Sequence, residues 1–173
     1  MSEQNNESLY KSQKAVKPKI EDVAGDFISE DKLKNLMNFL GFLRENKLTP
    51  RWASWNSWLV KFKSKNVCQI KIRDASWFVM LSAFTREKWF VGYEKYFADD
   101  ELKEFVWENN RGSWCSGNCK GKKRTFFGKE FNDVCTCWGI RAENPDGVAL
   151  ERSKRVILEI KKFIAGLAAA SKA

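Results

Sequence analysis

The chain has 173 residues, among them 31 lysines and arginines, 22 aspartates and glutamates and no histidine, so its formal net charge is +9. The absence of histidine excludes Ser-His-Asp and Cys-His nucleophile activation, together with the imidazole proton shuttle that most acid–base enzymes use near neutral pH. Hydrophobic residues make up 43% of the chain and aromatic residues 14%, which is typical of one globular domain and not of a disordered or fibrous protein.

The first 25 residues are polar and have no hydrophobic period, so we expect a disordered tail over 1–25. This segment lacks the apolar core of a signal peptide, and no run in the chain approaches the roughly 18 apolar residues of a membrane span. The sequence therefore predicts a cytoplasmic protein without a membrane partner.

A single domain is expected over 26–168, followed by a frayed C-terminus at 169–173. Its first element is an amphipathic helix over 30–46 with Ser29 as N-cap. Thr49-Pro50 should end this helix, because a residue before proline is disfavoured in helical geometry. The apolar residues that define the helix recur at spacings of three and four: Leu33, Leu36, Met37, Leu40 and Leu43.

A change of the hydrophobic period to two predicts strands over 58–62 and 68–72, joined by a turn at 64–66. The next run, 76–84, is apolar on both faces, which predicts a central strand. Basic residues alternate with apolar ones along the first two strands. One face of the sheet is therefore expected to carry Lys61, Lys63, Lys71 and Arg73.

A short helix is predicted to begin at Asp99-Asp100 and to end near Asn109, with Leu102, Phe105 and Val106 buried. A cysteine-rich insert over 111–141 follows, with short strands at 124–127 and 134–140.

The last helix is expected to begin at Asn144-Pro145-Asp146. These elements predict an α+β fold, in which a small antiparallel sheet of three to five strands packs against N-terminal and C-terminal helices. The apolar face of the last helix is formed by Val156, Ile157, Ile160, Phe163, Ile164 and Leu167.

Four of the five cysteines form two close pairs in the insert, with the spacing C-x3-C-x15-C-x-C. Four thiolates bind Zn²⁺ in a closed tetrahedral shell, and short-range pairs lower the entropy cost of assembling that shell. The pattern therefore predicts a structural zinc site at Cys115, Cys119, Cys135 and Cys137.

Two other interpretations of these cysteines stay open. They are free thiols with no shared task, or they form disulfides or a redox relay in which Lys120 and Lys122 lower a thiol pKa. A cytoplasmic location disfavours permanent disulfides.

Tryptophan occurs at every third position of the segment RWASWNSW, residues 51–58. Such rings either pack in a core or line a pocket, since tryptophan faces bury a large apolar area and attract cations. A later aromatic loop contains one carboxylate, which would suit an amphiphilic cation. The predicted ligand site comprises Trp52, Trp55, Trp58, Trp89, Tyr93 and Glu94.

Nucleic-acid binding is an alternative that uses the basic residues. Residues 111–129 contain six basic residues and no acidic one, although a solvated loop is the competing interpretation of this charge. Bases would stack on aromatic rings beside the basic strand face. The residues of this alternative are Lys61, Lys63, Lys71, Arg73, Lys120, Lys122, Lys123 and Arg124.

The stretches WLVKFKSKNVCQIKI (58–72), ELKEFVWEN (101–109) and FGKEFNDVC (127–135) resemble a group of small bacterial single-domain proteins that has no assigned activity. That group has a cysteine-rich insert before its F-G-K-E-F segment. The resemblance covers residues 30–165 and implies a compact domain with a cysteine site. From the resemblance we expect a set of more closely spaced cysteines that includes one further cysteine. The C-x3-C pair of this chain departs from that pattern.

Together these features predict a non-enzymatic, zinc-stabilised cytoplasmic domain that recognises a small ligand or a protein partner through an aromatic surface. The alternatives are nucleic-acid binding and thiol redox chemistry.

Overall fold

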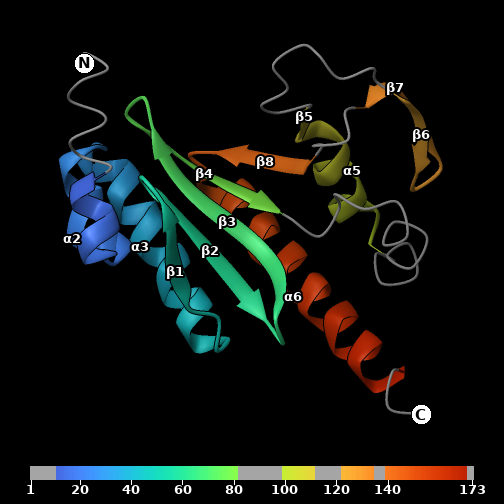
Figure 1. The fold of residues 1–173 in the computed structure, drawn as a ribbon. Helices are drawn as coiled ribbons and strands as arrows, with labels where there is room; N and C mark the ends of the chain where they lie inside the picture. Colours follow the sequence, from blue (N-terminus) through green and yellow to red (C-terminus); the bar gives the residue numbers. More distant parts are fainter. Residues whose placement is uncertain (1–10, 82–98, 112–121, 135–138, 171–173) are drawn as a thin grey trace.

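The computed structural model describes residues 11–81, 99–111, 122–134 and 139–170 (Figure 1). These residues form a six-stranded antiparallel sheet in the order β1-β2-β3-β4-β8-β5, together with a separate hairpin of β6 and β7. The predicted α+β fold class is confirmed. The strands are β1 (Pro50–Ser54), β2 (Ser57–Phe62), β3 (Lys65–Arg73), β4 (Ser76–Leu81), β5 (Asn110–Arg111), β6 (Lys122–Phe126), β7 (Lys129–Val134) and β8 (Gly139–Glu143). The helices are α2 (Ile20–Val23), the 3-10 helix η1 (Ala24–Asp26), α3 (Glu30–Glu45), α5 (Asp100–Glu108) and α6 (Gly147–Ala170).

One face of the sheet is apolar and forms the core with the helices. Strand pairing places Trp58 opposite Ile70 and Ile72 opposite Trp77, and all four side chains are buried. Helices α3 and α6 pack against this inner face and lie behind the sheet in Figure 1. Phe39 of α3 reaches Trp77 of β4, with ring centroids 5.7 Å apart. The predicted central strand is confirmed as far as β4 extends, because β4 lies between β3 and β8.

The opposite face, which we call the open face, is turned toward the viewer in Figure 1, and no helix of the described residues lies over it. Since successive side chains of a strand alternate between faces, the register identifies its members. Leu59 of β2 and Phe78 of β4 lie on it. Its basic residues come from four strands: Arg51, Lys61, Lys71, Arg73 and Arg141.

Helix α3 confirms the predicted amphipathic helix, but it ends before Pro50 by a different device. Lys47 adopts a left-handed conformation with φ of 58°. Its N–H donates to the carbonyl of Arg44 at 2.9 Å, and the N–H of Leu48 donates to the carbonyl of Leu43 at 2.8 Å. This pair of bonds is the Schellman arrangement, which satisfies the last carbonyls of a helix and is usually built on glycine.

Tight two-residue turns connect the strands of the meander. The β2–β3 turn is Lys63-Ser64, with φ of 45° and 64°, and not 64–66 as the sequence suggests. Asp74-Ala75 joins β3 to β4 with φ of 53° and 55°. Positive φ at both central residues matches the right-handed twist of the flanking strands. Without glycine or Asn-Gly at these positions, the exact turn residues are not apparent from the sequence.

The prediction of a disordered tail over 1–25 is wrong for residues 11–25. Residues 11–16 are helical, and α2 and η1 follow them. Ile20, Ala24 and Gln13 are buried, and the indole Nε1 of Trp58 donates to the carbonyl of Pro18 at 2.9 Å. A few isolated apolar side chains anchor this segment, which is why it shows no hydrophobic period.

Helices α5 and α6 confirm their predicted positions. The Asp99 carboxylate caps α5 by accepting the N–H groups of Glu101 and Leu102. On α6 the predicted apolar face is buried except for Leu167, which is 41% exposed near the end of the helix. Within the described ranges, no helix combines the length and apolarity needed to cross a membrane.

The strands of the insert differ from the prediction. A turn at Phe127-Gly128, with φ of 48° and 77°, joins β6 to β7. The segment that was expected to form one strand over 134–140 instead contains the last residue of β7 and the first two residues of β8. Residues 135–138 lie outside the described residues.

Candidate functional site

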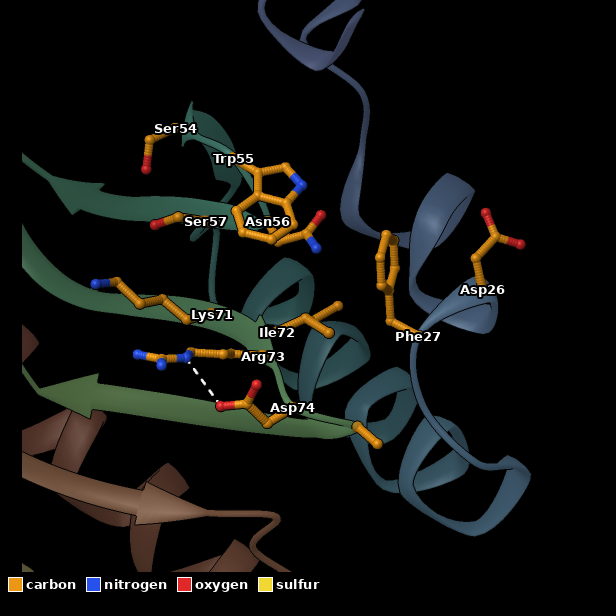
Figure 2. A pocket seen from close by; sticks show the side chains of 11 residues that line it. Asp26, Phe27, Ser54, Trp55, Asn56, Ser57, Lys71, Ile72, Arg73 and Asp74 are labelled. Atoms are coloured by element: carbon orange, nitrogen blue, oxygen red, sulfur yellow. Dashed lines mark ion pairs between the residues drawn. The ribbon is translucent and has the colours of Figure 1, made fainter. Parts of the chain in front are cut away.

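A pocket of about 630 Å³ lies where η1 meets the β1–β2 and β3–β4 turns (Figure 2). The β1–β2 turn is Trp55-Asn56, in which Asn56 has a φ of 46°. The carbonyl of Asn56 accepts the N–H of Ile72 at 2.9 Å, which holds the turn against the end of β3. The pocket is lined by Asp26, Phe27, Ser54, Trp55, Asn56, Ser57, Lys71, Ile72, Arg73, Asp74 and Ala75.

The aromatic part of the pocket is Trp55 with Phe27. The indole of Trp55 is half-buried, and its Nε1 is buried with no hydrogen-bond partner among the described residues. In Figure 2 this nitrogen is on the edge of the indole nearer to Phe27. A buried donor that lacks a protein partner is costly, because its bond to water has been lost without replacement. Trp55 is therefore suited to donate to a molecule in the pocket.

The charged part of the pocket is the end of β3. Arg73 Nε lies 2.9 Å from Asp74 Oδ2, so these two charges balance each other. The pKa of Lys71 is lowered, first by burial of its ammonium and then by the positive charges of Arg141 and Arg73. Asp26 also lines the pocket, but its carboxylate is directed away from Trp55 in Figure 2. The local field at Lys71 therefore favours an anion.

The three predicted tryptophans do not form one surface. Trp52 pairs with Trp58 across β1 and β2 on the inner face, where Trp58 is completely buried. Trp52 is half-buried, and its Nε1 donates to Gln13 Oε1 at 3.3 Å. Only Trp55, in the turn between them, lines the pocket. The predicted residues Trp89, Tyr93 and Glu94 lie outside the described residues.

Three of the predicted basic residues, Lys61, Lys71 and Arg73, share the open face, as the alternation of residues suggests. Lys63 does not, because it belongs to the β2–β3 turn, where its ammonium lies 5.6 Å from the ring centroid of Phe62.

The described basic residues of the predicted 120–124 loop belong to the separate β6–β7 hairpin and not to the six-stranded sheet. Lys122, Lys123 and Arg124 belong to β6, and Lys123 forms an ion pair with Glu130 of β7 at 2.8 Å. Lys120 lies outside the described residues. The predicted contribution of this loop to binding stays untested.

Two basic residues of the open face were missed from the sequence. Arg51 is exposed on the edge strand β1, opposite Leu59. Arg141 lies on β8, opposite Met80, and its guanidinium carbon is 3.9 Å from the ring centroid of Phe78. The alternation of apolar and polar residues along β8 is the one local signal for Arg141. It does not show which strand pairs with β8, and so it does not place Arg141 beside Phe78.

The four predicted zinc ligands Cys115, Cys119, Cys135 and Cys137 all lie outside the described residues. In the part of the chain that the structure describes, no three histidine, cysteine, aspartate or glutamate side chains come together as a metal-binding group. Cys68 is completely buried on β3, and burial raises the pKa of its thiol far above the usual range. It is a core residue and not part of a thiol site.

Comparison of the chain with protein-family models, with curated proteins and with solved structures finds no match.

Proposed function

We propose that the chain is a non-enzymatic binding domain that takes up a planar, acidic small ligand in the pocket at Trp55. The observation that carries this proposal is one cavity that combines the indole of Trp55 with Lys71 and Arg73. An aromatic ring of the ligand stacks on the indole, and its acidic group lies toward the basic side chains. The volume of about 630 Å³ suits a small molecule.

The charges of the pocket favour an acidic ligand over the amphiphilic cation considered from the sequence. Asp74 is engaged by Arg73, and the Asp26 carboxylate points away from the indole. A cation would have to lie beside Lys71, whose pKa is already lowered by burial and then by the charges of Arg141 and Arg73. An anion there is attracted to all of these basic groups.

Calorimetric titration with 2-naphthoate tests the proposal, with 2-naphthalenemethanol as the uncharged probe of the same shape. We expect naphthoate to bind more tightly than the alcohol, and Trp55→Ala to weaken naphthoate binding by about tenfold or more, because stacking area and a donor are both lost. Trp107→Phe, which also removes one indole, is the control, since Trp107 lies on α5 and does not line the pocket. Equal binding by Trp55→Ala and the wild type would refute the proposal.

Nucleic-acid binding is a second candidate, favoured by the gathering of Arg51, Lys61, Lys71, Arg73 and Arg141 on the open face. A single strand lying across this face would release counterions from its phosphates. The logarithm of its affinity should then fall with the logarithm of salt concentration by about 0.7 per phosphate contacted. Affinity for an oligothymidylate that does not change with salt would remove this candidate.

Structural zinc bound by Cys115, Cys119, Cys135 and Cys137 stays part of the proposal, and a cytoplasmic location with it. The donor set supports a closed, non-catalytic shell, since it consists of four thiolates. Native mass spectrometry of freshly reduced protein tests it: one zinc per chain, lost together with the fold on chelation, is expected. A metal-free mass with reversible two-proton losses on mild oxidation would instead favour the thiol redox alternative.

A further inference from the structure

The side chains of Lys71, Phe78 and Arg141, which come from three neighbouring strands, meet on the open face beside the pocket. The register places Lys71 of β3 directly opposite Phe78 of β4, and Arg141 of β8 opposite Met80. The guanidinium of Arg141 lies over the ring of Phe78, with its central carbon 3.9 Å from the ring centroid. Because Phe78 is only 3% exposed, it forms a fixed floor that holds the guanidinium in one orientation.

Lys71, Arg73 and Arg141 form a cluster of three positive charges on the open face. Arg73 follows Lys71 on the same face of β3, and the charges of Arg73 and Arg141 both lower the pKa of Lys71. Asp74 lies 2.9 Å from Arg73, and Glu143 lies 3.8 Å from Arg141. Bringing these cations together disfavours the folded state, and an anion between them offsets that repulsion.

The cluster is both reachable and partly shielded from water. The side chain of Arg141 is 23% exposed and that of Arg73 is 55% exposed. Partial burial strengthens electrostatic attraction, because fewer water dipoles screen it. The planar fork of an arginine matches the oxygens of a phosphate group, while a lysine adds a point charge.

We propose that Lys71, Arg73 and Arg141 form a binding centre for a phosphate group, with Phe78 positioning the guanidinium of Arg141. Lys71 and Arg73 also line the pocket. A phosphate at the centre and a ring on Trp55 can therefore belong to one nucleotide unit, a point that rests on the proposed function. The phosphate belongs either to a free nucleotide or to the backbone of a single strand.

Titrations with three probes test the centre: inorganic phosphate, adenosine monophosphate and a short oligothymidylate. We expect Lys71→Met and Arg141→Met each to weaken binding of at least one probe by about tenfold or more, since each removes a hydrogen bond to a charged group. Lys162→Met is the matched control, because Lys162 is an exposed residue of α6 that pairs with Glu159. This variant loses the same charge away from the open face and should bind all three probes as the wild type does.

The probes also distinguish the two sources of the phosphate. Saturable binding of adenosine monophosphate, displaced by inorganic phosphate, indicates a free nucleotide. Binding of the oligothymidylate alone, with strong salt dependence, indicates a nucleic-acid backbone. If Arg141→Met does not fold, Lys71→Met carries the test, because Lys71 is not fully buried.

The outcomes separate this inference from the proposed function. Wild-type affinity of Lys71→Met and of a folded Arg141 variant for every probe overturns the phosphate centre, even when naphthoate still binds at Trp55. The absence of measurable binding of all three probes to the wild type overturns it as well. If Trp55→Ala binds naphthoate as the wild type does, while Lys71→Met and Arg141→Met show the expected losses, the proposed ligand pocket is refuted and the phosphate centre is supported.

Discussion

The side-chain amide of Gln13 both donates a hydrogen bond to Asn56 and accepts one from it. Gln13 Nε2 donates to Asn56 Oδ1 at 2.6 Å, and Gln13 Oε1 accepts the backbone N–H of Asn56 at 2.9 Å. Gln13 Oε1 also accepts the indole N–H of Trp52 at 3.3 Å. One buried amide therefore fixes the N-terminal segment to the turn that carries Trp55 into the pocket.

Replacing Gln13 by alanine is expected to lower the free energy of unfolding by about 2 kcal/mol. The substitution leaves the N–H of Asn56 and the indole N–H of Trp52 without their acceptor, and unsatisfied buried donors are costly. Urea unfolding measures the change. Val16→Ala on the same helical segment is the control, since Val16 is 74% exposed and should matter little. Equal stability of the two variants would show that the segment is not anchored through Gln13.

Replacing Lys71 by methionine is expected to raise the stability of the ligand-free protein at neutral pH, by less than about 1 kcal/mol because the ammonium stays partly solvated. The lowered pKa of Lys71 means that folding disfavours its charged form. Since the unfolded chain holds this proton more tightly, wild-type stability should also rise as the pH approaches the ordinary lysine value of 10.5. The variant should lack that contribution. Thermal unfolding across neutral and alkaline buffers measures both effects, and a less stable variant would contradict the prediction.

Acid is expected to weaken the contact between α5 and α6. Glu101 accepts hydrogen bonds from Arg155 at 2.9 Å and from Arg152 at 3.0 Å, and these bonds lower the pKa of its carboxyl. A lowered pKa contributes stability that is present above the ordinary value of 4.5 and is lost as the pH falls through the folded value.

Melting temperatures measured from neutral to acidic pH test this contact. Glu101→Gln should have a lower melting temperature at neutral pH and a flatter decline in acid, because glutamine has no charge to lose. High salt should reduce the difference between the two proteins, since all three side chains are partly exposed. A wild-type and a variant profile of the same slope would mean that Glu101 does not couple the helices.

Cys68 is expected to resist alkylation in the folded protein, because it is completely buried and burial raises the pKa of its thiol. Iodoacetamide labelling followed by peptide mapping measures this directly. The peptide that contains Cys68 should stay unlabelled in native buffer and become labelled in denaturant. Labelling of Cys68 at the rate of a model thiol in native buffer would place this residue at the surface and not in the core.

Elements with a complete local signal were predicted from the sequence. Helix α5 has an acidic N-cap at Asp99 and a stripe of Leu102, Phe105 and Val106, and both features are local. Strand β1 was missed for a physical reason: Trp52, Trp55 and Trp58 have nearly helical spacing, but a two-residue turn separates the first from the last. The spacing of the tryptophans does not reveal this turn, in which the left-handed residue is Asn56 and not a glycine.

The candidate site was predicted only in part. The sequence named Trp55 from the repeated spacing of the tryptophans, and it named Lys71 and Arg73, for the nucleic-acid alternative, from the alternation of basic with apolar residues. All three line the pocket. The position of Arg141 over Phe78 depends on the pairing of β4 with β8, two strands between which residues 82–138 intervene in the chain. No local pattern contains that pairing. Phe27 follows directly after η1, whose first two residues belong to the segment 1–25 that was expected to be disordered.

The separation of β4 and β8 has a consequence for the order of folding. Strands β1 to β4 form a meander of short hairpins, whose local contacts can close early. Strand β8 pairs with β4 only across the segment that contains α5, β5, β6 and β7, and closing so long a segment costs more entropy. Lys71 and Arg73 are on the early part and Arg141 is on the late part. A nascent chain or a partly folded intermediate would thus hold only two of the three cations, and affinity for phosphate would report that the last strand has docked.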